Sequence, residues 1–140
     1  MRNAFVVAAA LVFAVLLSLG GECGATHIRH SQQAYNSTIT VYKSNSFAVP
    51  LFFTANDTIT GSFTVVGQKH IDLFVMDTLN YRHSTHDSAH SEFARTDTSY
   101  SDIFLATQFG DTFFFEFVNH DPDSLHKVLL QLNRVYWETQ

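Results

Sequence analysis

Apolar and polar residues alternate along residues 58–65, and residues 113–117 have a phenylalanine at every second position, with Phe114 and Glu116 between. A period of two residues is typical of β-strands, because successive side chains of a strand point to opposite faces of the sheet. We therefore expect one face of each strand to pack in a hydrophobic core. The side chains predicted to face this core are Ile59, Phe63 and Val65 in the first strand and Phe113, Phe115 and Phe117 in the second.

Shorter β-rich runs complete the pattern, at residues 39–42, 47–53, 71–76, 102–106 and 128–137. The run at 71–76 is apolar on both faces, which predicts a strand in the middle of a sheet. The turn before it predicts a hairpin with the preceding strand, and Pro50 predicts an edge strand or a bulge. No long window has helical periodicity. The chain is thus predicted to be all-β, an antiparallel β-sandwich of the jelly-roll type with about seven or eight strands.

Residues 1–25 have the order of a secretory signal peptide. Their apolar run, residues 4–17, is followed by small residues up to Ala25. Because a membrane-spanning helix needs roughly 20 apolar residues, we expect cleavage after Ala25 or Cys23 rather than retention as an anchor. The predicted organisation is a signal helix at residues 1–25, a flexible arm at residues 26–37 and one sandwich domain at residues 38–140.

The composition limits the possible compartments of the protein and the possible classes of ligand. The formal net charge is −5, with 8 Lys and Arg against 13 Asp and Glu, and the basic residues form no cluster. This argues against nucleic acids and anionic membrane surfaces as ligands. The single cysteine, Cys23, lies in the predicted signal peptide, so the sandwich depends on its core rather than on disulfides. We expect a secreted or secretory-pathway lumenal protein, which would contact a membrane only if residues 1–25 are retained.

Three motifs resemble a known family. They are the strand Ile71-Asp72-Leu73-Phe74-Val75, Gly110 followed by the FFFEFVN run of residues 113–119, and Ser124 with Lys127-Val128. Together they resemble the GOLD (Golgi dynamics, p24-like) domain over residues 39–135. The resemblance implies a GOLD-like sandwich that recognises cargo or a partner in the secretory pathway. The chain departs from that family at Asp111-Thr112 and Val118, and it lacks the coiled coil and C-terminal membrane helix of the p24 proteins.

The candidate binding residues are aromatic. Residues 78–101 have no apolar period, and this 24-residue stretch exceeds the roughly 12–15 residues of ordinary structureless loops. Phe74, Tyr81 and Phe114 fall in this stretch or on the outer face of a predicted strand, where a partner could cover them. The sequence contains no nucleophile elbow, phosphate-binding glycine loop or H-E-x-x-H motif, so we predict no enzymatic activity and no cofactor.

Metal binding and glycosylation are the alternatives. His83, His86 and His90 form an H-x2-H-x3-H pattern that could bind zinc, although a polar loop also tolerates histidine without metal. Aspartates at the predicted turns could bind calcium or cap the turns. The sequons at Asn36 and Asn56 are glycosylation sites only if the source is a eukaryote.

The predicted function is therefore a non-catalytic binding module that recognises another protein, or a lipid, through residues 78–101 and the adjacent outer strand face. The alternative is a carbohydrate- or metal-binding extracellular jelly-roll module.

Overall fold

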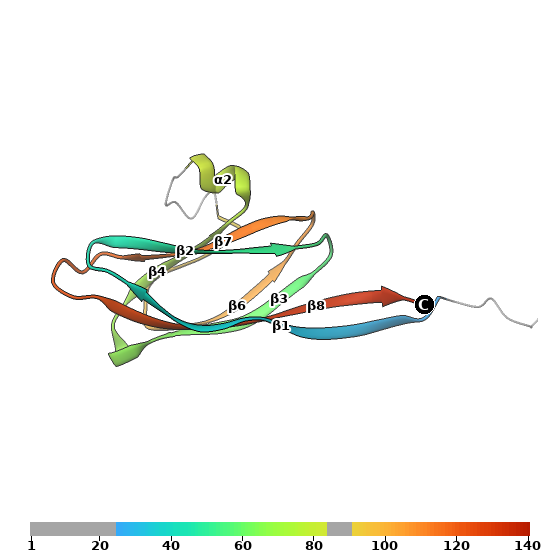
Figure 1. The fold of residues 1–140 in the computed structure, drawn as a ribbon, viewed down its shortest axis with the longest axis horizontal. Coiled ribbons are helices and arrows are strands. Elements are labelled where there is room, and N and C mark those ends of the chain that lie inside the picture. Colours follow the sequence, from blue (N-terminus) through green and yellow to red (C-terminus); the bar gives the residue numbers. More distant parts are fainter. Residues whose placement is uncertain (1–24, 84–90) are drawn as a thin grey trace, which may run out of the picture. The chain divides into compact units, whose positions relative to one another are not determined.

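The computed structural model describes residues 25–83 and 91–140. These residues form eight strands in two four-stranded sheets that pack face to face (Figure 1). The first sheet has the order β1 (His27–Val41), β8 (His126–Thr139), β3 (Thr58–Val65) and β6 (Tyr100–Ala106). The second sheet has the order β2 (Asn45–Phe53), β7 (Asp111–Asn119), β4 (Ile71–Met76) and β5 (Phe93–Thr98). The predicted all-β antiparallel sandwich is confirmed.

The chain divides into two compact units. Residues 29–138 form the sandwich unit, and among the described residues 25–28 and 139–140 belong to the other. In the latter, the Gln140 N–H donates to the Thr26 carbonyl oxygen at 3.1 Å. The predicted signal helix, residues 1–25, lies outside the described residues except for Ala25. No helix among residues 25–83 and 91–140 has the length and apolar character to cross a membrane.

The core between the two sheets is aromatic. Phe63 of β3 and Phe117 of β7 meet edge to face with ring centroids 5.5 Å apart, and this pair joins the two sheets. Phe53 of β2 packs against Phe115 with centroids 6.5 Å apart. The six side chains that the alternation predicts to face the core are all buried there: Ile59, Phe63, Val65, Phe113, Phe115 and Phe117.

Strand β4 occupies the middle of the second sheet, between β7 and β5, as its two apolar faces predict. The predicted hairpin between β3 and β4 is wrong, because β3 pairs with β6 and β8 in the first sheet. The connection is the short helix η1 (Val66–Gln68), in which Gly67 has φ 77° and Gln68 has φ 55°. Two successive left-handed residues turn the chain out of one sheet and into the other.

Three other regions can be compared with the sequence. Pro50 lies in β2, an edge strand, as predicted. Residues 78–101, predicted to be a loop, contain α2 (Thr78–His83), β5 and the start of β6. Of the predicted flexible arm, residues 26–37, all but Thr26 belong to the first part of β1. These residues show no alternation because most of their side chains are at least partly exposed on both faces.

Asn119, at the end of β7, is buried and fixes two connections at one end of the sandwich. Its Nδ2 group donates to the carbonyl oxygens of Val41 at 3.3 Å, Tyr42 at 3.2 Å and Ser124 at 2.9 Å. Its Oδ1 atom accepts the Asp121 N–H at 2.9 Å. One amide therefore satisfies backbone groups next to both the β1–β2 and the β7–β8 connections, and Asn119 also lines the hollow described below.

Candidate binding surfaces

Helix α2 covers part of the outer face of the second sheet (Figure 1). Its first turn is capped by Asp77, whose Oδ1 atom accepts the Asn80 N–H at 2.7 Å. Asp111 of β7 accepts the Thr78 hydroxyl at 2.6 Å and the Thr78 N–H at 3.1 Å. These hydrogen bonds, led by that from the hydroxyl, hold the pKa of the Asp111 carboxyl below its ordinary value. A helix of six residues has little stability alone, so these caps and its packing determine its position.

The structure places the three predicted binding aromatics on this same face. Tyr81 of α2 stacks on Phe114 of β7, with ring centroids 4.0 Å apart and an interplanar angle of 2°. Phe74 of β4 is only 4% exposed. Tyr81 and Phe114 thus come together, but they cover each other, and Phe74 presents almost no surface to a partner.

Only part of the predicted metal site can be located. His83 is exposed at the end of α2, whereas His86 and His90 lie outside the described residues. In the described ranges, no group of three or more His, Cys, Asp or Glu side chains is arranged to hold a metal ion. At the predicted calcium turns, Asp121 instead accepts the Ser124 hydroxyl and the backbone N–H groups of Asp123 and Ser124. These bonds, the Ser124 hydroxyl first, hold the pKa of Asp121 well below its ordinary value.

Both predicted sequon asparagines are exposed. Asn36 lies in β1, where its Oδ1 atom faces the Gln131 amide of β8 at 3.4 Å. Asn56 lies in the turn between β2 and β3 with φ 66°, a left-handed conformation that asparagine tolerates. The adjacent Asp57 is buried and pairs with Arg134 at 2.6 Å, which fixes this turn.

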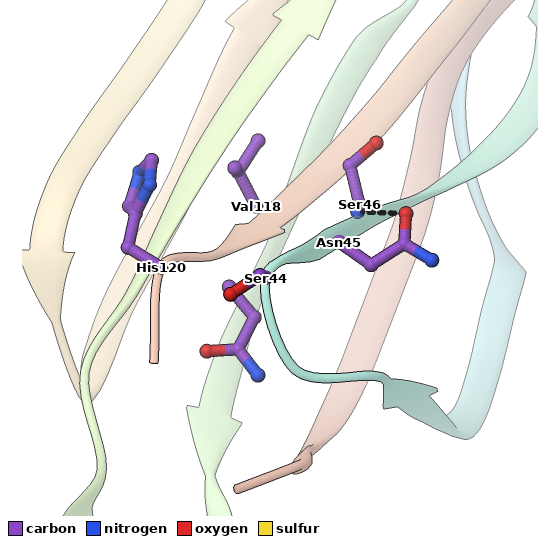
Figure 2. Close-up of a pocket in the computed structure, with 6 residues that line it drawn as sticks. Ser44, Asn45, Ser46, Val118 and His120 are labelled. Carbon is purple, nitrogen blue, oxygen red and sulfur yellow. Dashed lines mark hydrogen bonds between the residues drawn. The ribbon is translucent and has the colours of Figure 1, made fainter. Parts of the chain in front are cut away.

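A hollow of about 350 Å³ lies at the end of the second sheet where β2 begins and β7 ends (Figure 2). It is lined by Ser44, Asn45, Ser46, Val118, Asn119 and His120. The Asn45 side chain accepts the Ser46 N–H at 2.8 Å. The side-chain amide of Asn119 donates its hydrogen bonds to backbone carbonyl oxygens. Figure 2 shows Val118 between His120 and Ser46.

Next to this hollow, two imidazoles and two carboxylates form a chain of contacts. His120 Nε2 lies 2.9 Å from Asp72 Oδ2, and Asp72 Oδ1 accepts the Asp97 N–H at 2.7 Å. Asp97 Oδ1 then lies 3.0 Å from His70 Nδ1. Asp97 has φ 50° and sits where the β4–β5 register shifts, which is typical of a β-bulge that redirects a side chain. Sequence reasoning missed this cluster because its members come from two strands, β4 and β5, and from two connections, and they are far apart in the sequence.

The outer face of the first sheet is the second surface that sequence reasoning did not single out. Its central strand, β3, presents hydroxyl side chains, and the edge strand β6 presents two aromatic rings. Phe104 is 67% exposed and Tyr100 is 53% exposed. Register sets three cross-strand rows on this face: Tyr100, Thr64 and Leu129; Asp102, Ser62 and Gln131; Phe104, Thr60 and Asn133.

Within this face, the Tyr100 hydroxyl donates to Asp102 Oδ1 at 2.6 Å. This hydrogen bond is the main reason that the pKa of Tyr100 is raised above its ordinary value. The alternation of residues 58–65 predicts that the face of β3 opposite the core, which carries the hydroxyl side chains, is exposed to solvent. What the sequence did not indicate is that β6 lies beside it and adds the aromatic rings.

Neither the scan against protein-family models nor the search of curated proteins finds a match. Among solved structures, the chain is similar to PliG of Aeromonas hydrophila, a periplasmic lysozyme inhibitor of g-type lysozyme. The TM-score is 0.38 at 10% identity, and the match covers 81% of this chain and 86% of that chain. It is also similar to the capsid structure of the Helicobacter pylori bacteriophage KHP30, with a TM-score of 0.41, 11% identity, and coverage of 79% and 94%.

A third solved structure is the CBM36-1 domain of a multidomain xylanase from the hindgut metagenome of Trinervitermes trinervoides. Its TM-score is 0.34 at 9% identity, with coverage of 78% of this chain and 97% of that domain. At such low scores and identities, no function of these proteins is carried over to this chain. None of the three is a GOLD domain, and the resemblance to that family stays a prediction.

Proposed function

We propose that this chain is a non-catalytic, extracytoplasmic binding module that recognises a partner protein through the outer face of the first sheet. The observation that carries the proposal is the pair of exposed rings on one strand, Phe104 and Tyr100, beside a row of hydroxyl side chains. Four residues along a strand separate the rings by about 13 Å. Exposed aromatic anchors within a polar surround are characteristic of protein interfaces.

The chemistry of this face favours a protein over the other classes of ligand. Its polar groups are hydroxyls and amides, with the carboxylate of Asp102, and they can pair with peptide groups and with neutral side chains. Nucleic acid is disfavoured by the net charge of −5. Lipid, the other predicted ligand, would leave the hydroxyls of Thr60 and Ser62 without partners.

The compartment is part of the proposal. It is supported by the order of residues 1–25, which is that of a signal peptide, and by the predicted GOLD resemblance, which implies recognition in the secretory pathway. The predicted surface around α2 is the less favourable place for the partner, because Phe74 is buried and Phe114 lies under Tyr81.

The test uses a photo-crosslinking amino acid placed at Phe104 in the full chain produced in its own host. The matched control places the same group at Leu79 of α2, which is similarly exposed at 64%. We expect one discrete adduct from position 104 and none from position 79. In binding assays with that adduct's protein, Phe104→Ala should weaken affinity at least tenfold, about 1.4 kcal/mol, whereas Leu79→Ala should not. An adduct from position 79 alone, or an unchanged affinity for Phe104→Ala, would overturn the proposal.

A carbohydrate is the second candidate for the same face. The observation in its favour is that flat rows of hydroxyl, amide and carboxylate groups lie between the two exposed rings, so that sugar hydroxyls could hydrogen-bond while a ring stacks on Phe104. Screening the chain on immobilised glycans separates the two candidates. Binding to one glycan class that is lost in Phe104→Ala and kept in Leu79→Ala would favour the carbohydrate and displace the protein partner.

A further inference from the structure

We propose that the free edge of β1 pairs with β1 of a second copy of this chain in antiparallel orientation. Strand β1 is the outermost strand of the first sheet, and β8 is its one neighbour in the sheet order. Along residues 29–40, the backbone groups that point away from β8 therefore face no strand in the described part of the chain. A row of unpaired N–H and C=O groups is a template for another strand.

The other three edge strands carry the features that normally prevent such pairing. Strand β2 contains Pro50, which cannot donate a ladder hydrogen bond. Strand β5 has the irregular register at Asp97 and the charged Arg95. Strand β6 is short, at seven residues, and carries Asp102. Charge, proline, bulges and short length are the usual protections of a sheet edge.

Strand β1 has none of these protections over most of its length. It spans 15 residues, contains neither proline nor glycine, and has Arg29 as its one charged side chain other than histidine. It has no aspartate or glutamate, although the whole chain has a net charge of −5. Pairing two copies along β1 therefore brings together the strands that lack the acidic groups of the chain.

A shallow hollow beside this edge would receive side chains of the added strand. It has a volume of about 190 Å³ and lies between Gln32, Gln33 and Ala34 of β1, Arg134 of β8 and the end of β2, where Phe52 is 66% exposed. Alternate side chains of a strand paired with β1 point toward the same side as this hollow. The added strand would thus cover Phe52 as well as satisfy the backbone.

A second copy is the occupant that the charges favour. In a two-fold antiparallel pair, a residue before the centre lies opposite a residue equally far after it. With the centre near Gln33, Arg29 of one copy faces Ser37 of the other, and the two Arg29 side chains are about 26 Å apart. No like charges meet along residues 29–37. Arg29 is the one charged side chain of β1 other than histidine, and Arg134 beside the hollow is already paired with Asp57. A charged peptide from another protein would therefore find little unpaired charge at this edge.

The test measures the mass of the purified full-length chain by sedimentation over a range of concentrations. We expect a reversible dimer. Gln33→Lys places two ammonium groups near the two-fold axis and should weaken dimerisation at least tenfold. The matched control, Asn133→Lys, adds the same charge at an exposed position of β8 and should leave dimerisation unchanged. A monomer at all concentrations, or a dimer equally affected by both variants or by neither, would overturn the proposal.

A second measurement covers the case in which Gln33→Lys fails to fold. In a Cys23→Ser background, a single cysteine at Gln33 should form a disulfide-linked dimer on mild oxidation, because the two copies bring this position together. A cysteine at Asn133 should not. Absence of the linked dimer at position 33, or equal linkage at both positions, would count against pairing at this edge.

Discussion

Gly61 of β3 faces the β8 backbone so closely that a side chain has no room there. An added Cβ atom would lie 2.0 Å from the Gln131 carbonyl oxygen. We expect Gly61→Ala to lower the free energy of unfolding by about 1–3 kcal/mol, the usual cost of overpacking, because the atom in the way is backbone and belongs to a central ladder. Gly110→Ala is the control, since its nearest atom would be 3.6 Å away. Urea unfolding measures both variants, and equal stabilities would contradict the proposed contact.

Two carboxylates should make stability fall in acid. The Thr78 hydroxyl lowers the pKa of Asp111, and the Ser124 hydroxyl lowers that of Asp121. The unfolded chain titrates near the ordinary aspartate value of about 3.9 and therefore takes up protons first as the pH falls. The stabilisation is complete above that value and is lost as pH decreases through the lower folded pKa values.

The melting temperature measured from pH 7 to pH 2 should therefore decrease below about pH 4. Asp121→Asn should show a shallower decrease in that window, because one of the two groups no longer titrates. Curves that run parallel for the wild type and Asp121→Asn would indicate that the Ser124 hydrogen bond does not perturb this carboxyl in solution.

At the scale of elements, α2 is held by its caps and by one ring contact. Tyr81→Ala removes the stack on Phe114, whose centroid distance is 4.0 Å, and should cost about 1 kcal/mol of stability. The backbone amides of α2 should also exchange faster with solvent, since a six-residue helix does not persist without packing. Leu79→Ala, at an exposed position of the same helix, is the control. Unchanged exchange in Tyr81→Ala would mean that the Asp77 and Asp111 caps suffice.

The sequence could predict those strands in which one face meets the core. Alternation marked the buried sides of β3 and β7, and the two apolar faces of β4 marked its central place. Which strands pair with each other could not be predicted from this alternation. The β3–β4 connection looks like a hairpin turn, and only the left-handed backbone at Gly67 and Gln68 carries it between sheets.

The first part of β1, strand β5 and the short helix α2 could not be predicted from the sequence, for physical reasons. The first part of β1 has water on both faces, so its residues have no period to detect. Strand β5 is an edge strand with an irregular register, and α2 is too short for helical periodicity. The outer face of the first sheet depends on strand pairing that the sequence did not indicate: Tyr100 and Phe104 lie beside the hydroxyl side chains because β6 pairs with β3. Residue types suggested Phe74, Tyr81 and Phe114, but not that two of them stack.

At the scale of the whole molecule, stability rests on the aromatic core. The chain has a single cysteine, so no intramolecular disulfide can support the sandwich. Phe63 and Phe117 join the two sheets, and both are fully buried. Removing one of these rings leaves a cavity between layers that cannot close without shifting a whole sheet.

We therefore expect Phe63→Ala to lower the free energy of unfolding by about 3–5 kcal/mol, a large part of the 5–15 kcal/mol typical of a domain. Phe104→Ala removes the same ring from an exposed position and should change stability by less than about 0.5 kcal/mol. Chemical denaturation of both variants measures the difference. A large loss in Phe104→Ala would mean that this ring supports the fold, and its effect on partner binding could then no longer be assigned to the surface. A small loss joined to weakened binding would place Phe104 in the recognition surface.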